Sequence, residues 1–197
     1  LTAEAAKKFG GIEPGARKGT YLIIWTTTPW TLMGNVAVAV HPEFEYAVRN
    51  AGPNEEWITL QNLPASGRSA LDVTEGSHPV KRRVRGKDLE GLVYQHPLIS
   101  RLGKVVLADY VSSEDGTGLV HIAPGFGAED YAAGKRNNLE VLAPVDSQGK
   151  FVGLPKEVAQ FDGKQVQDSN QAVVDLLRER DSLIKSVILQ HQYPHCW

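Results

Sequence analysis

Short runs of β-branched and aromatic residues follow one another closely along this chain, and this spacing constrains its fold more than any other feature. Such runs are typical of buried strands. They predict strands at 20–28, 35–40, 43–49, 57–60, 80–84, 105–111, 119–123, 141–145 and 186–189. Helices are predicted at 3–9, 129–136 and 170–180. Because the strands outnumber the helices and do not alternate with them, a doubly wound parallel sheet is disfavoured. We predict a mainly β fold, with a β-barrel core and peripheral α-helices.

Length, charge and cysteine content narrow the class of protein. The 197 residues suit a single domain, and the net charge of −2 gives no overall attraction to nucleic acid. Cys196 is the single cysteine, so it forms neither an internal disulfide nor a cysteine-cluster zinc site. The histidines lack metal-ligand spacing, and no apolar run approaches the roughly 18 residues of a membrane helix. We expect a cytoplasmic, monomeric domain without metal, cofactor or membrane contact.

A first dense segment reads W-T-T-T-P-W-T-L and runs from Trp25 to Leu32. Side chains alternate between the faces of a strand, so Thr26 and Thr28 should share one face and Thr27 should take the other. Pro29 should end the strand pairing. Threonine hydroxyls both donate and accept hydrogen bonds, so they can orient a water, although they are poor bases. The alternative is that threonine simply favours strands.

A second dense segment, from Gly116 to Asp130, reads G-T-G-L-V-H-I-A-P-G-F-G-A-E-D. It predicts a strand, a sharp glycine turn and the start of a helix. Asp130 then lies near the first helical turn, where its carboxylate either binds a ligand's ammonium group or complements the helix dipole. His121 points from the strand into either a pocket or the core, and for a lone histidine the core is the ordinary outcome.

A basic cluster precedes the middle of the chain. Its members are Lys81, Arg82, Arg83 and Arg85. They could contact the phosphates of an RNA acceptor end, but a solvated strand face is equally ordinary. No glycine-rich nucleotide fingerprint or Walker lysine occurs in the chain, so we do not expect it to bind a nucleotide through such a motif.

The two dense segments together resemble the editing domain of isoleucyl-tRNA synthetase. The resemblance rests on W-T-T-T-P-W-T-L followed by Gly34-Asn35, and on G-T-G-x-V-H-x-A-P-x-x-G-x-x-D downstream. The valyl and leucyl relatives usually carry arginine in place of Thr28 and an acid in place of Trp30, so the isoleucyl branch is favoured. Met33 departs from the proline that is usual in the family, which leaves the local loop shape open.

The resemblance implies a function and a set of roles. The domain would hydrolyse valine misattached to isoleucine tRNA, and also valyl-adenylate, with the α-amino group of the substrate anchored by Asp130. The water or the ester oxygens would be positioned by Thr26, Thr27 and Thr28. The substrate site would also include Trp25, Trp30, His121, Ala123 and Gly125.

The resemblance also implies boundaries and partners. Residues 1–18 would be a linker, 19–192 the editing domain, and 193–197 the start of the return to the catalytic body. The partners would be the 3′ end of isoleucine tRNA and the rest of the parent synthetase in cis. Two alternatives stay open. One is the editing domain of a valyl or leucyl sibling, and the other is a non-catalytic RNA-binding module that stacks bases on Trp25 or Trp30.

Overall fold

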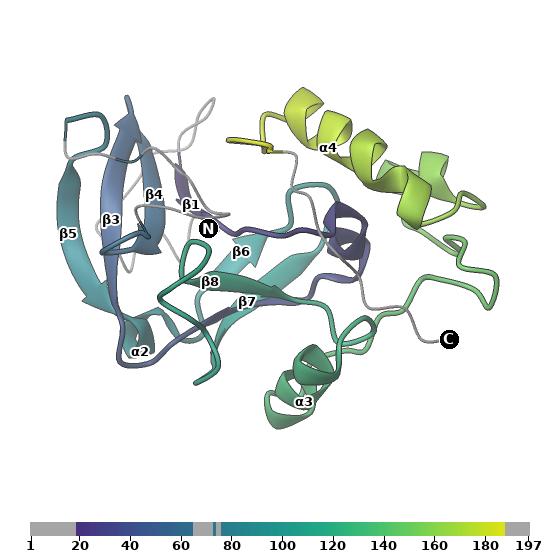
Figure 1. The fold of residues 1–197 in the computed structure, drawn as a ribbon, viewed down its shortest axis with the longest axis horizontal. Helices are drawn as coiled ribbons and strands as arrows, with labels where there is room; N and C mark the ends of the chain where they lie inside the picture. The colour runs from purple at the N-terminus through teal and green to yellow at the C-terminus, as the bar shows by residue number, and fades with distance from the viewer. Residues whose placement is uncertain (1–18, 65–72, 74–75, 188–197) are drawn as a thin grey trace.

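The computed structural model describes residues 19–64, 73 and 76–187, and within them eight strands form two four-stranded sheets (Figure 1). The first sheet has the order β1 (Gly19–Leu22), β4 (Glu55–Leu60), β3 (Glu45–Gly52), β5 (Val80–Arg85). The second has the order β6 (Val93–Gln95), β7 (Leu102–Leu107), β2 (Ala37–Val40), β8 (Leu119–Ile122). The predicted linker at 1–18, the helix at 3–9 and the return segment at 193–197 lie outside the described residues.

Most of the predicted strands are confirmed, with shifted ends. Those at 35–40, 43–49, 57–60, 80–84, 105–111 and 119–123 correspond to β2, β3, β4, β5, β7 and β8. Strands β3 and β4 form an antiparallel hairpin with Val48 opposite Ile58, and Asn54 in its turn has a φ of 66°. Asparagine tolerates this left-handed conformation, so it fits this turn. The three-residue strand β6 was missed.

Both sheets contribute to one core, but the predicted barrel is wrong, because within the described residues the sheets do not close into one. Val38 of β2, Tyr46 of β3 and Ile58 of β4 belong to the same buried cluster. The Tyr46 hydroxyl donates to Gly118 O at 2.8 Å and accepts from His41 N at 2.9 Å, so it ties the sheets together. The arrangement remains mainly β with peripheral helices, as expected.

The predicted strand at 20–28 ends early, and this removes the threonines from the sheet. Strand β1 stops at Leu22, and Ile23 N makes a further bond of 3.2 Å to Ile58 O. Beyond it, Thr28 N donates to Thr26 Oγ1 at 3.0 Å. Such local side-chain bonds compete with strand pairing. The predicted alternation of threonine faces is therefore wrong.

In Figure 1 the two longer helices lie to the right of the first sheet, and a short helix lies below it. The predicted helices at 129–136 and 170–180 are confirmed as α3 (Ala128–Arg136) and α4 (Asn170–Glu179). Short helical segments complete the set: η1 (Pro29–Gly34), α2 (Gly86–Leu89), η2 (Lys156–Phe161) and η3 (Gln167–Ser169). No helix in the described part of the chain has the length and apolarity needed to cross a membrane.

The strand predicted at 141–145 does not form. Val145 makes only an isolated bridge with Phe151, and Val141 is 50% exposed. Pro144 lacks the N–H that a continuing ladder needs. The strand predicted at 186–189 is absent at 186–187, and its other two positions lie outside the described residues.

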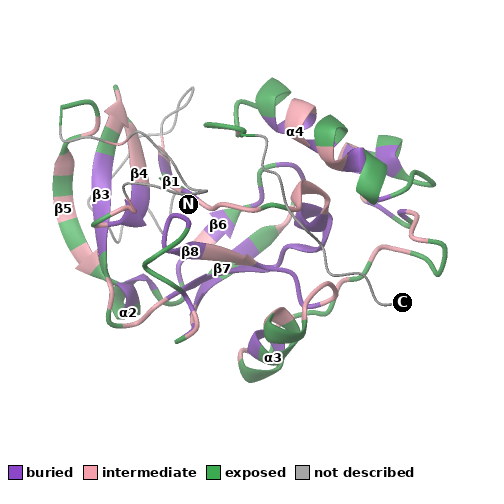
Figure 2. Ribbon diagram, viewed as in Figure 1, coloured by how far each residue is buried: buried purple, intermediate pink, exposed green. Residues whose placement is uncertain are grey.

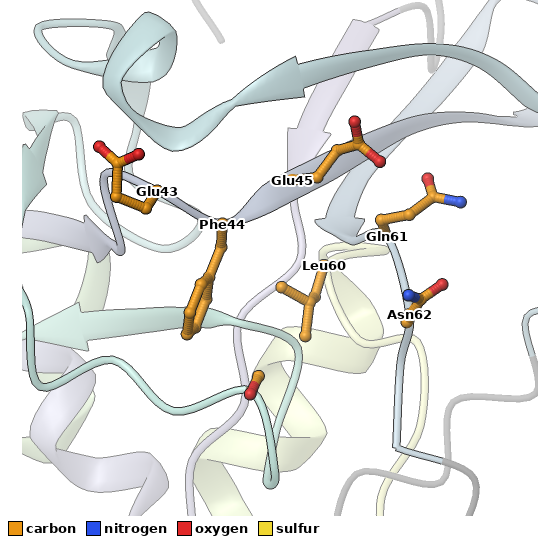
Figure 3. A pocket seen from close by; sticks show the side chains of 7 residues that line it. Glu43, Phe44, Glu45, Leu60, Gln61 and Asn62 are labelled. Carbon is orange, nitrogen blue, oxygen red and sulfur yellow. The ribbon is translucent and has the colours of Figure 1, made fainter.

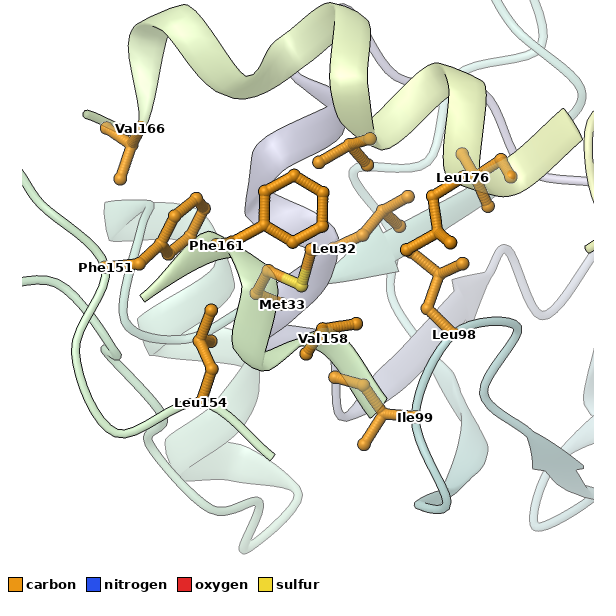
Figure 4. Packing of buried hydrophobic residues seen from close by; sticks show 12 residues of the cluster. Leu32, Met33, Leu98, Ile99, Phe151, Leu154, Val158, Phe161, Val166 and Leu176 are labelled. Atoms are coloured by element: carbon orange, nitrogen blue, oxygen red, sulfur yellow. The ribbon is translucent and has the colours of Figure 1, made fainter. Parts of the chain in front are cut away.

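A second buried cluster joins η1 to the C-terminal helices (Figure 4). Leu32 and Met33 of η1 pack there against Val173 and Leu176 on the buried stripe of α4. Figure 2 shows this stripe alternating with exposed positions along the helix, as expected for an amphipathic surface helix. The same short helix that follows the threonines is thus held in the hydrophobic interior.

Candidate functional site

The threonine cassette (residues 25–32) begins in irregular backbone and ends in η1. The hydroxyls of Thr27 and Thr28 lie 3.3 Å apart, and Thr26 Oγ1 accepts the Thr28 N–H. Thr27 is exposed, whereas Thr26 and Thr28 are half-buried. The three candidate hydroxyls therefore gather in one turn, where they can contact solvent or ligand.

Helix η1 fixes the end of the cassette. Pro29 takes its first position, where a missing N–H costs nothing. Thr31 Oγ1 donates to Thr28 O at 2.8 Å, and Trp30 N donates to Asn170 Oδ1 of α4 at 3.2 Å. Thr31 was not predicted as a site residue. Thr31 lies three residues after Thr28, which is one turn of a 3-10 helix. This spacing is the sequence feature that could have identified Thr31 as a partner of Thr28.

The two dense segments meet at His121. Strand β8 pairs with β2, and His121 Nε2 lies 3.2 Å from Thr31 Oγ1. The Thr31 hydroxyl already donates its hydrogen to Thr28 O. Its Oγ1 must therefore accept a hydrogen bond from His121, so Nε2 carries the hydrogen of the imidazole ring. Nδ1 is then a bare acceptor, and it is buried without a hydrogen-bond partner.

His121 is neutral in this environment. Burial lowers its pKa to about 4, and the nearby His96 lowers it too. A neutral ring with one free acceptor can line a pocket, but it cannot supply a proton as an acid near pH 7. The binding role of His121 stays a prediction.

Asp130 lies in the first turn of α3, as predicted. Its Oδ2 accepts the Ala123 N–H at 3.0 Å, which bridges the end of β8 to the helix. Burial raises the pKa of this carboxyl, and the bond from Ala123 opposes that rise. No ion pair joins Asp130 to a cation of the described residues. A half-buried carboxylate without a cation is costly, and a cationic ligand would offset that cost.

Aromatic rings connect the cassette to the glycine turn. The rings of Trp30 and Phe126 meet edge to face with centroids 4.8 Å apart. A Cβ on Gly34 would come within 2.5 Å of the Phe126 ring, so this glycine permits the contact. A Cβ on Gly125 would overlap Leu142 O. Gly125 therefore serves close backbone packing, a role the sequence prediction did not give it.

The structure places Trp25 beside the second segment too. A Cβ built on Gly116 would lie 3.9 Å from the Trp25 side chain. Among the candidate residues, the two segments thus come together through Trp25, Trp30 and His121, whereas the Ala123–Asp130 bond lies within the second segment. Within the described residues, no group of three or more His, Cys, Asp or Glu side chains could hold a metal ion.

The predicted RNA-binding residues lie apart from this site, on strand β5. They are Lys81, Arg82, Arg83 and Arg85. Lys81 and Arg82 approach Glu56, with N–O distances of 2.7 and 3.9 Å. Arg83 approaches Glu45 at 3.8 Å. Two glutamates thus offset part of the charge of these four cations, and an RNA contact here stays a prediction.

A surface hollow of about 430 Å³ lies between β3 and the loop before β8 (Figure 3). Phe44 and Leu60 form its apolar part. Its remaining lining residues are Glu43, Glu45, Gln61, Asn62 and Ser113. None of the candidate site residues lines it, so it is a separate feature of the surface.

Comparison with known sequences points to one group of enzymes. The isoleucine–tRNA ligase of Fervidobacterium nodosum is 47% identical over 178 residues, and that of Thermotoga neapolitana is 44% identical over 181 residues. Each match covers 90% of this chain but 19% of the relative. The chain thus spans about a fifth of the length of these aminoacyl-tRNA ligases. No family model matches it.

Solved structures give the fold independently. The GlLeuRS-CP1 crystal structure aligns with a TM-score of 0.68 at 17% identity, covering 96% of this chain and 89% of that chain. The editing domain of P. knowlesi cytosolic leucyl-tRNA synthetase aligns with a TM-score of 0.59 at 11% identity, covering 84% and 83%. This chain shares their fold.

Proposed function

Because the chain is homologous to one segment of the isoleucine–tRNA ligases, we propose that it is the proofreading domain of such a ligase. The proposed reaction is hydrolysis of the ester that links a misattached valine to the terminal ribose of isoleucine tRNA. Valyl-adenylate is a second proposed substrate. The isoleucyl enzyme is itself the usual example of such a double sieve, in which a second site admits only the smaller product.

The observation that carries this proposal is the uncompensated carboxylate of Asp130. Oδ2 is occupied by Ala123 N–H, which leaves Oδ1 for a ligand. An α-ammonium group would supply the cation that the described side chains do not. A charge-assisted hydrogen bond of this kind contributes roughly 1.5–3 kcal/mol.

The remaining candidate residues support hydrolysis without a strong base. The hydroxyls of Thr26, Thr27 and Thr28 gather at an accessible turn, where they can orient the attacking water. Trp30 and the neutral His121 would shape the pocket against the larger isoleucine. The terminal ribose hydroxyl would assist proton transfer. Catalysis would then come from positioning and electrostatics.

The test is deacylation of valine-charged isoleucine tRNA by this chain and by the ligase that contains it. Release of valine that is selective over isoleucine and lost in Asp130→Ala supports the proposal. Full activity of Asp130→Ala would overturn the assigned role. Faster release of threonine from valine tRNA would instead favour the valyl sibling.

The proposed partners follow from the same reading. They are the 3′ end of isoleucine tRNA, the rest of the parent ligase in cis, and no second copy of this chain. We place the reaction in the cytoplasm. The alternative of a non-catalytic RNA-binding module predicts tRNA binding without turnover, and the paired charges on β5 weaken its main support.

A further inference from the structure

The carbonyl end of η1 is held by side chains of the loop that follows β6. His96 Nε2 lies 2.8 Å from Leu32 O. Arg101 Nη1 donates to Met33 O at 3.2 Å and to Asn35 O at 3.0 Å. Leu32 O also accepts the Asn35 N–H at 3.0 Å, so His96 gives it a second donor. Met33 O lies at the end of the helix, where carbonyls lack partners within the helix, and Arg101 supplies its donor.

The hydrogen bonds of His96 define its tautomer. Nδ1 accepts the N–H groups of Leu98 and Ile99, at 3.0 and 3.1 Å. Nε2 therefore carries the hydrogen and donates to Leu32 O. The side chain is 3% exposed, and burial lowers its pKa to about 4. The neutral His96 ring thus accepts hydrogen bonds from its own loop through Nδ1 and donates one to η1 through Nε2.

The loop is braced beyond His96. Gln95 Nε2 donates to Ile99 O at 2.8 Å and to Arg101 O at 3.1 Å, which closes the loop on itself. Leu98 and Ile99 pack with Leu32 and Met33 in the same cluster (Figure 4). The loop and η1 therefore share both polar and apolar contacts, and a change in one is transmitted to the other.

Helix η1 also carries Thr31, whose hydroxyl contacts both Thr28 O and His121. Only one residue separates Thr31 from Met33, so a shift of the carbonyl end displaces the hydroxyl with it. We propose that His96 and Arg101 are positioning residues for hydrolysis, acting through η1 on the Thr28–Thr31–His121 unit. This inference rests on the proposed function, because the reaction it concerns is the proposed deacylation.

Two substitutions of His96 separate its two roles. His96→Asn keeps an acceptor at the place of Nδ1 for the loop N–H groups but is too short to reach Leu32 O. His96→Gln keeps a donor that can reach Leu32 O. We expect His96→Asn to lower kcat for valine release about tenfold with KM within twofold, because the ammonium contact at Asp130 is untouched. His96→Gln should retain at least half of the activity.

A second readout is independent of activity. The ¹⁵N shifts of the His121 ring report its Nε2–H tautomer and the bond to Thr31. They should change in His96→Asn and stay near the wild-type values in His96→Gln. Should either His96 variant not fold, Arg101→Lys and Arg101→Met give the same comparison, with lysine retaining a donor and methionine removing it.

Equal kcat values and equal His121 spectra for the two members of a pair would overturn the positioning role. A purely structural role would lower the melting temperature without this split. If the wild-type chain and its ligase release no valine, the proposed function fails, and the His121 spectra alone decide whether the loop positions η1.

Discussion

Strand β5 and the start of helix α3 differ in how their charges are balanced. Lys81 and Arg83 of β5 each approach a glutamate of the same sheet. Asp130 of α3 forms no ion pair with a cation of the described residues, and burial raises its pKa. Two glutamates thus pair with part of the basic charge on β5, while the Asp130 carboxylate has no cationic side-chain partner among the described residues. A charged ligand is recognised by side chains whose charge is not already neutralised by an ion pair within the protein.

The largest expected effect is at Asp130. Asp130→Asn keeps an oxygen for the Ala123 N–H but removes the charge. We expect kcat/KM for valine release to fall roughly 10- to 150-fold, which corresponds to loss of about 1.5–3 kcal/mol. The melting temperature should stay level or rise, because a half-buried charge disappears. Steady-state deacylation and thermal unfolding measure the two quantities.

Glu129→Gln is the matched control, since Glu129 is exposed on the same helical turn. It should leave both quantities close to wild type. An equal loss of activity in the two variants would mean that general acidity near α3, and not the Asp130 carboxylate, carries the effect.

A smaller effect is expected at Thr31, whose hydroxyl contacts both Thr28 O and His121 Nε2. Thr31→Val leaves the Nε2–H of His121 without its acceptor, at a cost of about 1–3 kcal/mol in the free energy of unfolding. We expect deacylation to fall as well, since the cassette loses the bond to Thr28 O. Thr31→Ser keeps the hydroxyl and should restore both. Failure of serine to restore them would assign the effect to the methyl group.

Changing pH sharpens the contrast, because the buried histidines and Asp130 respond with opposite signs. His96 and His121 have pKa values lowered to about 4, so the unfolded chain binds more protons below about 6.5. The free energy of unfolding is therefore unaffected by these histidines above pH 6.5 and falls as the pH decreases towards 4. The decrease is up to about 1.4 kcal/mol per pH unit for each histidine. The raised pKa of Asp130 instead favours the folded state as the carboxyl becomes protonated.

Urea unfolding between pH 7 and pH 4.5 tests this sign. Stability should fall with decreasing pH, and the slope should be shallower in His96→Gln. A stability that is flat over this interval would contradict the neutral, buried state of the two histidines.

The smallest effect is expected on β5. Surface ion pairs contribute about 0–1 kcal/mol, so Lys81→Gln and Arg83→Gln should change kcat/KM by less than about threefold. Filter binding of tRNA at two salt concentrations gives a direct check. A tenfold loss of tRNA affinity, with a weaker salt dependence, would restore β5 as an RNA contact.

The sequence correctly predicted those helices and strands in which the local pattern of apolar residues matches the face that is buried in the structure. Helix α4 was predicted because its apolar stripe fits one buried face. The strand at 20–28 failed because the β-branched run does not show that Thr26 will bond to Thr28 N–H. The barrel failed with it, because pairing of sheet edges is a tertiary property.

For the candidate site, the sequence named most of the residues but not their partners. His121 and Asp130 were predicted, whereas Thr31 and Phe126 were not assigned a role. The bond between Thr31 and His121 joins positions 90 residues apart, and the loop that holds η1 comes from a third segment. Contacts at such separation depend on strand order and register, which no local pattern contains.

The bond between Trp30 N and Asn170 Oδ1 has a consequence for the order in which the chain is made. It joins residues 140 positions apart, and Leu32 and Met33 share their cluster with α4. Translation releases the N-terminal residues first, so the threonine cassette leaves the ribosome long before α4 does. A nascent chain halted before residue 170 would present the hydroxyls without the helix that anchors them. If the chain performs the proposed hydrolysis, this activity would arise late in synthesis, after α4 has emerged.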